Sequence, residues 1–154
     1  MFRRTFFAAV LVTLVLCGSL AAEEARELQP GSFRTLDIWV DSNGESLAAY
    51  QIEIVYDRSK MKVVGIEGGE SKAFNAAPYY DPAGMSGGRI VIAAFTAKDE
   101  DAPRGRTRVA RLHLHVTGPG APGVEIRLVT AARPGGARIE PKVELAETEE
   151  GDKR

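Results

Sequence analysis

The stretch LAAYQIEIVYD, from Leu47 to Asp57, alternates apolar and polar residues over the length of one β-strand. Side chains of a strand point to opposite faces in turn, so this alternation is typical of a strand with one buried face. The pattern predicts one face made of Tyr50, Ile52, Ile54 and Tyr56, and an opposite face made of Gln51, Glu53 and Val55.

Two further stretches have the same character. GRIVIAAF, Gly88 to Phe95, is almost continuously apolar and predicts a central strand over Arg89 to Thr96. RVARLHLHV, Arg108 to Val116, alternates again. It predicts an inward face made of Ala110, Leu112, Leu114 and Val116.

The rest of the chain continues this rhythm of short strands and Gly/Pro-rich turns. Weaker strands are expected at Thr35 to Val40, Met61 to Glu67, Val124 to Thr130 and Arg138 to Leu145. Asn43-Gly44 predicts a tight hairpin between the first strand and Leu47 to Tyr56, because Asn and Gly tolerate positive φ. In the first strand Leu36, Ile38 and Val40 share a face opposite Trp39. In the later strand Val124, Ile126, Leu128 and Thr130 again alternate with their neighbours. Pro141 belongs at an edge or a bulge. The chain is therefore predicted to be all-β, an antiparallel β-sandwich or jelly roll.

The N-terminus has the organisation of an export signal. Arg3 and Arg4 precede an uncharged apolar run, and Ser19-Leu20-Ala21 offers the small residues that a signal peptidase reads. We expect cleavage near Ala21, and an uncleaved membrane anchor is the alternative. The predicted organisation is a signal peptide over 1–21, a leader over 22–31, a sandwich domain over 32–145 and a charged tail over 146–154.

Composition limits the partners. Cys17, the single cysteine, lies in the export segment, so no disulfide is expected in the exported chain. Without Arg3 and Arg4 the chain has 18 basic and 21 acidic residues, a net charge of −3. This mild charge favours neither nucleic acid nor an anionic membrane surface as a partner.

No residues assemble into a recognisable catalytic motif. His113 and His115 lie two apart on a strand, and their interpretation as a solvated face is preferred over a metal pair. Asp41 to Glu45 lacks the spacing of a calcium loop, and Asp99-Glu100-Asp101 is interpreted as a solvated charge run. No nucleophile-elbow motif occurs. We therefore predict no catalytic residues, no metal ligands and no enzyme activity.

In its order of strands and turns the chain resembles a cohesin domain, the receptor module of cellulosome scaffolds and related bacterial surface proteins. The resemblance is carried by SLAAYQIEIVYDRSKMKVVGIEGG (Ser46 to Gly69), GGRIVIAAFTAKD (Gly87 to Asp99) and RVARLHLHVTGPGAPGVEIRLV (Arg108 to Val129). It covers about Leu36 to Val143 and implies a jelly roll of about nine strands. Carbohydrate-binding modules share that architecture.

The resemblance also implies a partner and a site. A cohesin binds a dockerin, a protein module that carries its own calcium, so no cofactor is expected on this chain. The partner docks on a sheet face that includes Leu47 to Tyr56. The candidate partner-binding residues are Ala49, Gln51, Tyr79, Tyr80, Lys98 and Asp99.

The leading hypothesis is an exported, non-catalytic binding module for a protein partner, active in extracellular polysaccharide breakdown. One alternative is a carbohydrate-binding module that stacks a polysaccharide on Trp39, Tyr79 and Tyr80. Another is a structural envelope subunit that pairs through an edge strand.

Overall fold

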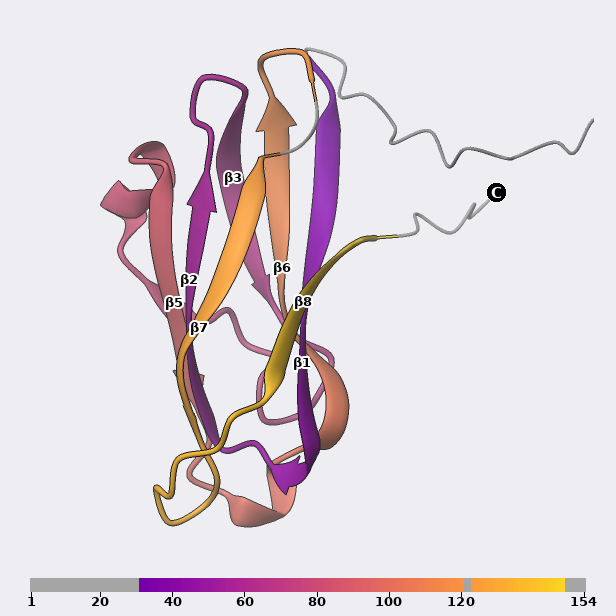
Figure 1. Ribbon diagram of the computed structural model, residues 1–154, viewed down its shortest axis with the longest axis vertical. Coiled ribbons are helices and arrows are strands. Elements are labelled where there is room, and N and C mark those ends of the chain that lie inside the picture. The colour runs from indigo at the N-terminus through magenta and orange to yellow at the C-terminus, as the bar shows by residue number, and fades with distance from the viewer. Residues whose placement is uncertain (1–30, 121–122, 149–154) are drawn as a thin grey trace, which may run out of the picture.

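The computed structural model describes residues 31–120 and 123–148, and these form two antiparallel sheets packed face to face (Figure 1). One sheet has the strand order β3-β6-β1-β8 and the other β4-β5-β2-β7. The all-β sandwich predicted from the sequence is confirmed. The predicted signal peptide and nearly all of the leader lie outside the described residues. No helix within the described residues has the length and apolarity to cross a membrane.

Eight strands and two 3-10 helices make up the described chain. Their bounds are β1 Phe33–Ser46, β2 Ala49–Tyr56, β3 Met61–Gly68, β4 Tyr79–Tyr80, η1 Pro82–Ser86, β5 Arg89–Phe95, η2 Asp99–Asp101, β6 Arg104–Val116, β7 Val124–Ala132 and β8 Lys142–Glu147. The described residues thus hold one strand fewer than the nine expected. β8 runs to Glu147, two residues beyond the expected end of the domain, and Pro141 precedes this edge strand.

The core lies between the sheets, where the predicted alternation places it. On β2, Tyr50, Ile52, Ile54 and Tyr56 are all buried. On β6 the predicted inward residues, from Ala110 to Val116, are buried as well. The hydroxyl of Tyr50 donates a hydrogen bond to the carbonyl of Val109 at 3.1 Å, which links the two sheets across the core. Burial raises the pKa of Tyr50, so the phenol remains a neutral donor.

The predicted hairpin at Asn43-Gly44 is wrong. Both residues have positive φ, 52° and 84°, as expected. However, β1 continues to Ser46 and pairs with β6 and β8, whereas β2 belongs to the other sheet. The turn is a bulge inside β1, held by the Ser42 hydroxyl, which donates to the Glu45 carbonyl at 2.6 Å and accepts from the Gly105 N–H at 3.0 Å. Local turn chemistry was predicted correctly, but the strands that it joins were not.

A second bulge changes the facing of β7. Val124, Ile126 and Leu128 pack against the core, but Thr130, which continues their alternation in the sequence, is exposed. The register against β2 shifts between Gln51 and Ile52, so that Ala131 is buried instead. One extra residue in the bulged strand inverts the faces beyond it.

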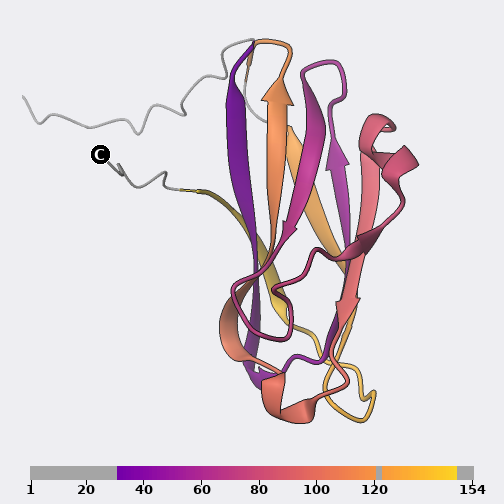
Figure 2. The same cartoon turned by 180° about the vertical axis from the view of Figure 1, so that it is seen from behind.

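The two side edges of the sandwich are built differently. At one edge the segment between β3 and β5, residues 69–88, crosses from sheet to sheet (Figure 2). This segment contains β4 and η1. It buries Phe74, whose ring meets that of Tyr50 edge to face at 5.2 Å between centroids. At the other edge, β7 and β8 are the end strands of their sheets.

Candidate protein-binding face

The candidate site lies on the outer face of the sheet β4-β5-β2-β7. Strand alternation turns Ala49 and Gln51 of β2 outward, opposite Phe95 and Ala93 of β5. On the other side the same two residues pair with Ala132 and Thr130 of β7. Because most of these side chains are small, the surface is hollowed.

This alanine hollow has a volume of about 220 Å³. It is lined by Ala49, Tyr50, Gln51, Tyr79, Ala93, Ala94, Phe95, Thr130, Ala131 and Ala132. Gln51 and Thr130 supply an amide and a hydroxyl group, and the other outward residues are apolar: Ala49, Ala93, Phe95 and Ala132. An apolar hollow with a few polar groups suits an apolar side chain of a ligand or a partner.

Two aromatic rings stand at one side of the hollow. Tyr79 and Phe95 are 72% and 65% exposed, the highest values among the large hydrophobic residues apart from Phe33. Their rings stack at 6.4 Å between centroids, with 14° between planes. Exposed rings that support one another have little conformational entropy to lose, which favours them as contacts for a partner.

The structure brings together three of the six predicted partner-binding residues. Ala49, Gln51 and Tyr79 line the alanine hollow. Tyr80 points the other way and packs against the core, because successive residues of a strand face opposite sides. Asp99 lines a separate hollow, and Lys98 is exposed just before η2.

A band of charge borders the alanine hollow along the same face. The carboxylate of Glu53 on β2 pairs with Arg89 of β5 at 2.5 Å and with Arg127 of β7 at 2.6 Å. Glu53 is only 7% exposed, while most of each arginine side chain is exposed. The hydrogen bonds from Arg127, followed by those from Arg89, lower the pKa of Glu53 below its usual value. A positively charged rim therefore lies over a fixed buried carboxylate.

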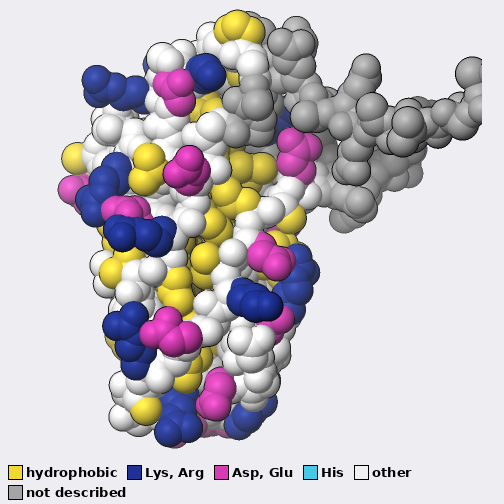
Figure 3. Space-filling view, in the orientation of Figure 1, with side chains coloured by type: hydrophobic (Ala, Val, Ile, Leu, Met, Phe, Trp, Pro, Cys, Tyr) yellow, Lys and Arg dark blue, Asp and Glu magenta, His cyan; other side chains and the backbone are white. Residues whose placement is uncertain are grey.

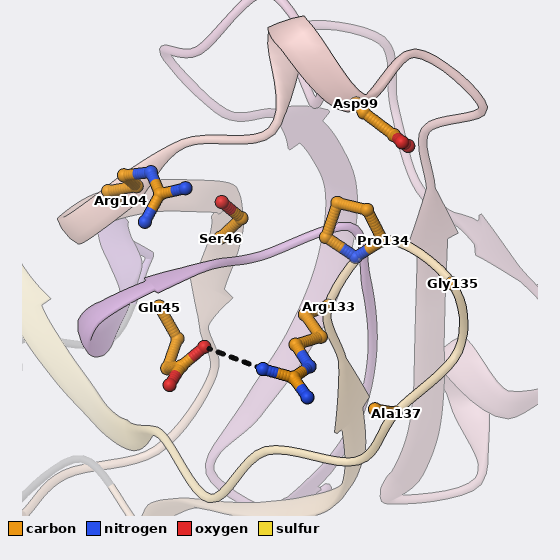
Figure 4. A pocket seen from close by; sticks show the side chains of 8 residues that line it. All are labelled: Glu45, Ser46, Asp99, Arg104, Arg133, Pro134, Gly135 and Ala137. Carbon is orange, nitrogen blue, oxygen red and sulfur yellow. Dashed lines mark ion pairs between the residues drawn. The ribbon is translucent and has the colours of Figure 1, made fainter.

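A charged hollow of about 720 Å³ lies beyond the end of this face, between loops (Figure 4). Arg133, next to Ala132, pairs with Glu45 at 3.7 Å across it. Arg104 donates to the carbonyl of Gly44 at 3.0 Å, and Asp99 comes from η2. The two charges are about half exposed, so this pair adds little stability.

The other candidate groups lie on the opposite sheet. Trp39 is in β1, and the guanidinium carbon of Arg106 stands 3.9 Å above its ring centroid. Trp39 is thus separated by the whole sandwich from Tyr79, so the three predicted sugar-stacking residues do not form one surface. His113 lies 3.0 Å from Glu67, and His115 stacks on Phe33. The described residues contain no group of three or more His, Cys, Asp or Glu positioned for a metal ion.

Sequence reasoning missed Phe95, Ala93, Thr130 and Ala132 as parts of the site. Phe95 ends the apolar stretch GRIVIAAF, and its alternation with Ala93 would have placed both on one face. Thr130 and Ala132 gave no such signal, because the bulge in β7 is not visible in the sequence.

No family model matches the chain, and no curated protein matches its sequence. Solved structures do match it. CaCohA2 of Clostridium acetobutylicum, in complex with CaDoc0917, is 15% identical with a TM-score of 0.59, over 73% of this chain and 85% of that chain.

A type I cohesin–dockerin complex of Clostridium thermocellum, Coh-OlpA with Doc918, is 18% identical over 78% of this chain and 91% of that chain, with a TM-score of 0.56. The sixth cohesin of scaffoldin B from Acetivibrio cellulolyticus, in complex with the Cel5 dockerin, is 14% identical over 78% and 89%, with a TM-score of 0.55. The chain therefore has a cohesin-like fold.

Proposed function

We propose that this chain is an exported, non-catalytic binding module that recruits a protein partner through the outer face of β4-β5-β2-β7. The observation that carries the proposal is the alanine hollow with the exposed, stacked rings of Tyr79 and Phe95 beside it. Contiguous exposed apolar surface of this kind marks interaction sites. Two large rings exposed to water are unfavourable in free energy unless a partner covers them.

The arrangement suits a folded partner. An apolar side chain of the partner would fill the hollow against Ala49 and Ala93, with its neighbours on Tyr79 and Phe95. Interfaces of this type obtain most of their energy from a few central aromatic anchors. The exposed guanidinium groups of Arg89 and Arg127 would lie at the rim, where they favour an acidic surface on the partner and speed association.

The partners of the similar structures support a proposal for the partner class. The similar structures are cohesins, and those reported as complexes contain a dockerin. We infer a dockerin-type or similarly small exported protein, with any calcium bound by the partner. The outward residues Ala49 and Gln51 would lie at the centre of that contact.

Export is the second part of this proposal. It rests on the basic and apolar residues that precede Ser19-Leu20-Ala21. N-terminal sequencing of the protein from culture fluid, periplasm and membranes tests it. We expect a chain that begins at Ala22; an intact N-terminus in the membrane fraction would show an anchor instead.

Capture of exported proteins on the immobilised chain, with and without a calcium chelator, tests the partner. We expect a dockerin-bearing protein to be retained and then lost on chelation. In titrations with that protein, Tyr79→Ala and Phe95→Ala should each raise the Kd about tenfold or more. Val64→Ala is the matched control, since Val64 is 50% exposed on the opposite sheet. Unchanged affinity in both ring variants would reject this face.

The exposed rings also suit a sugar, so affinity electrophoresis in a panel of polysaccharides belongs to the same test. Retardation that depends on Tyr79 would favour a carbohydrate-binding module over a protein receptor. Trp39→Ala should not change retardation, because Arg106 covers that ring.

A further inference from the structure

The open edge of β7 is the least protected edge of the sandwich. β7 is the end strand of its sheet and pairs regularly with β2 from Val124 to Leu128. Among the described residues, Arg138 and Ile139 join its outer side only at Ala132 and Ala131, and no strand pairs there beside Val124 to Leu128. The other end strands are poorer templates for pairing: β4 has two residues, β3 is interrupted between Val63 and Gly65, and Pro141 precedes β8.

Apolar side chains line the gap beside this edge. Val124, Ile126 and Leu128 of β7 and Val143 and Leu145 of β8 pack against the core but are only partly buried. Figure 3 shows a band of apolar surface that runs down this face of the molecule, between the positions of β7 and β8 in Figure 1. The opposite side of the sandwich has residues 69–88 as a cover. On this side, within the described chain, Arg138 and Ile139 lie against the edge only beside Ala131 and Ala132.

The sequence of the open edge is complementary to itself. In Val124-Glu125-Ile126-Arg127-Leu128, the residues next to Ile126 carry opposite charges, and the two residues beyond them are branched and apolar. In an antiparallel pair of two copies centred on Ile126, Glu125 faces Arg127 of the second copy, and Val124 faces Leu128. Opposite charges directly across two strands are favourable, as are pairs of branched apolar residues. Both arms of a two-fold interface then make the same contacts.

We propose that two copies of this chain dimerise through β7, with Val124–Leu128 paired antiparallel about Ile126. The occupant is a second copy rather than a terminal segment of the same chain. If the chain is cleaved after Ala21, as proposed above, its terminal sequences AEEARELQP (22–30) and EEGDKR (149–154) contain one large apolar residue, Leu28, and do not supply an alternating apolar face. Glu125 is exposed, and no ion pair forms with it among the described residues. A second copy would place opposite it Arg127, whose guanidinium also binds Glu53 of its own chain.

The dimer has a geometric consequence. Antiparallel pairing at the edge joins two sheets into one sheet of eight strands, with the outer faces on the same side. Two alanine hollows would then face a partner together, which raises the avidity for a bivalent or repetitive target. The contact is short, so we expect a weak dimer of the size class with interfaces below about 1,200 Å².

Sedimentation velocity of the exported chain, at about 10 μM to 1 mM, tests the dimer. We expect a concentration-dependent shift from monomer to dimer. Glu125→Arg places two like-charged pairs in the interface and should weaken dimerisation about tenfold or more. Glu100→Arg makes the same change in charge on the exposed η2 and should leave dimerisation unchanged. A monomer over the whole range, or a dimer that Glu125→Arg does not weaken, overturns the proposal.

A cysteine at the symmetry axis tests the register. The chain that starts at Ala22 contains no cysteine, so Ile126→Cys introduces a single thiol. At the axis the two thiols lie opposite each other, within the Cβ separation of facing residues in antiparallel strands. We expect a disulfide-linked dimer under mild oxidation, and much less from Glu100→Cys. Equal cross-linking at the two positions contradicts the register. Partner capture is a separate measurement, so this proposal and the proposed function fail independently.

Discussion

Two buried carboxylates, Glu53 and Asp37, each lie on the outer face of a sheet and bind arginine side chains. Glu53 on β2 lies between Arg89 and Arg127, and Asp37 on β1 binds Arg111 at 2.7 Å. Each carboxylate is shielded by arginine side chains from neighbouring strands. Arg89 and Arg127 are mostly exposed beside Glu53, whereas Arg108 and Arg111 are largely buried beside Asp37. Charged residues thus replace a second apolar layer on these outer faces.

The lowered pKa of Glu53 gives a pH-dependent prediction. The arginine hydrogen bonds lower the pKa of Glu53 below the usual value of a glutamate in an unfolded chain. The ionised form is therefore stabilised by folding, and this contribution is present above the pKa of the unfolded chain and is lost as the pH falls toward the pKa of the folded state. Glu53→Gln should lower the Tm at pH 7, and the difference from the wild type should shrink on acidification to about pH 3.5.

Thermal melts of both proteins from pH 7 to pH 3.5 measure this effect. Glu100→Gln, at an exposed position in η2, should melt with the wild type throughout. A Glu53→Gln difference that stays constant with pH would show that the arginine pairs do not couple Glu53 to folding.

Glycines and bulges set the path of the chain at the scale of single elements. The bulge in β1 turns at Asn43 and Gly44, whereas the end of β3 passes close to another strand at Gly69. A Cβ on Gly69 would lie 2.1 Å from the carbonyl oxygen of Arg108. The Gly69 N–H also donates to the Phe74 carbonyl at 2.6 Å, which starts the segment that closes this side of the core.

Two glycine substitutions separate close packing from backbone conformation. Gly69→Ala requires backbone movement and should lower the free energy of unfolding by about 3 kcal/mol or more, or prevent folding. Gly44→Ala meets no atom within 4 Å and has only its φ of 84° to oppose it, so about 1 kcal/mol is expected. Urea unfolding curves measure both, with soluble yield as the second readout for Gly69→Ala. Equal midpoints would contradict the close approach at Gly69.

Pairing between distant parts of the sequence dominates the whole molecule. β1 pairs with β6 and β8, and β2 pairs with β7. Neither sheet can therefore be completed until strands near the end of the sequence have joined it. The loop entropy of these contacts must be offset before they stabilise the chain. Sandwiches of this kind therefore fold slowly.

The fluorescence of Trp39 should report the pairing of β1 with β6 and β8. Trp39 is the only tryptophan, and it pairs with Arg108 of β6 and Glu144 of β8. We expect its fluorescence to recover on refolding over about milliseconds to seconds. Stopped-flow dilution from urea measures the rate, and an unchanged rate in Val64→Ala is the control. If the Trp39 fluorescence recovered fully within the dead time of the stopped-flow mixing, folding would not be limited by the pairing of distant strands.

The sequence by itself determined the fold class, the inward faces of β2 and β6, and most of the turn positions. These follow from the period of two in the strands and from local φ preferences, which neighbouring residues set. The resemblance to cohesins also placed Ala49, Gln51 and Tyr79 on a candidate face.

Only the tertiary structure decided which strands pair, where the bulge in β7 inverts its faces, and that Phe95, Thr130 and Ala132 complete the alanine hollow. It also decided that Tyr80 packs inward and that Trp39 lies on the opposite sheet. Pairing and register depend on contacts between residues far apart in the chain, and an alternating pattern is compatible with many of them. For that reason LAAYQIEIVYD predicts a strand with one buried face, while the neighbours of that strand make its other face a binding surface.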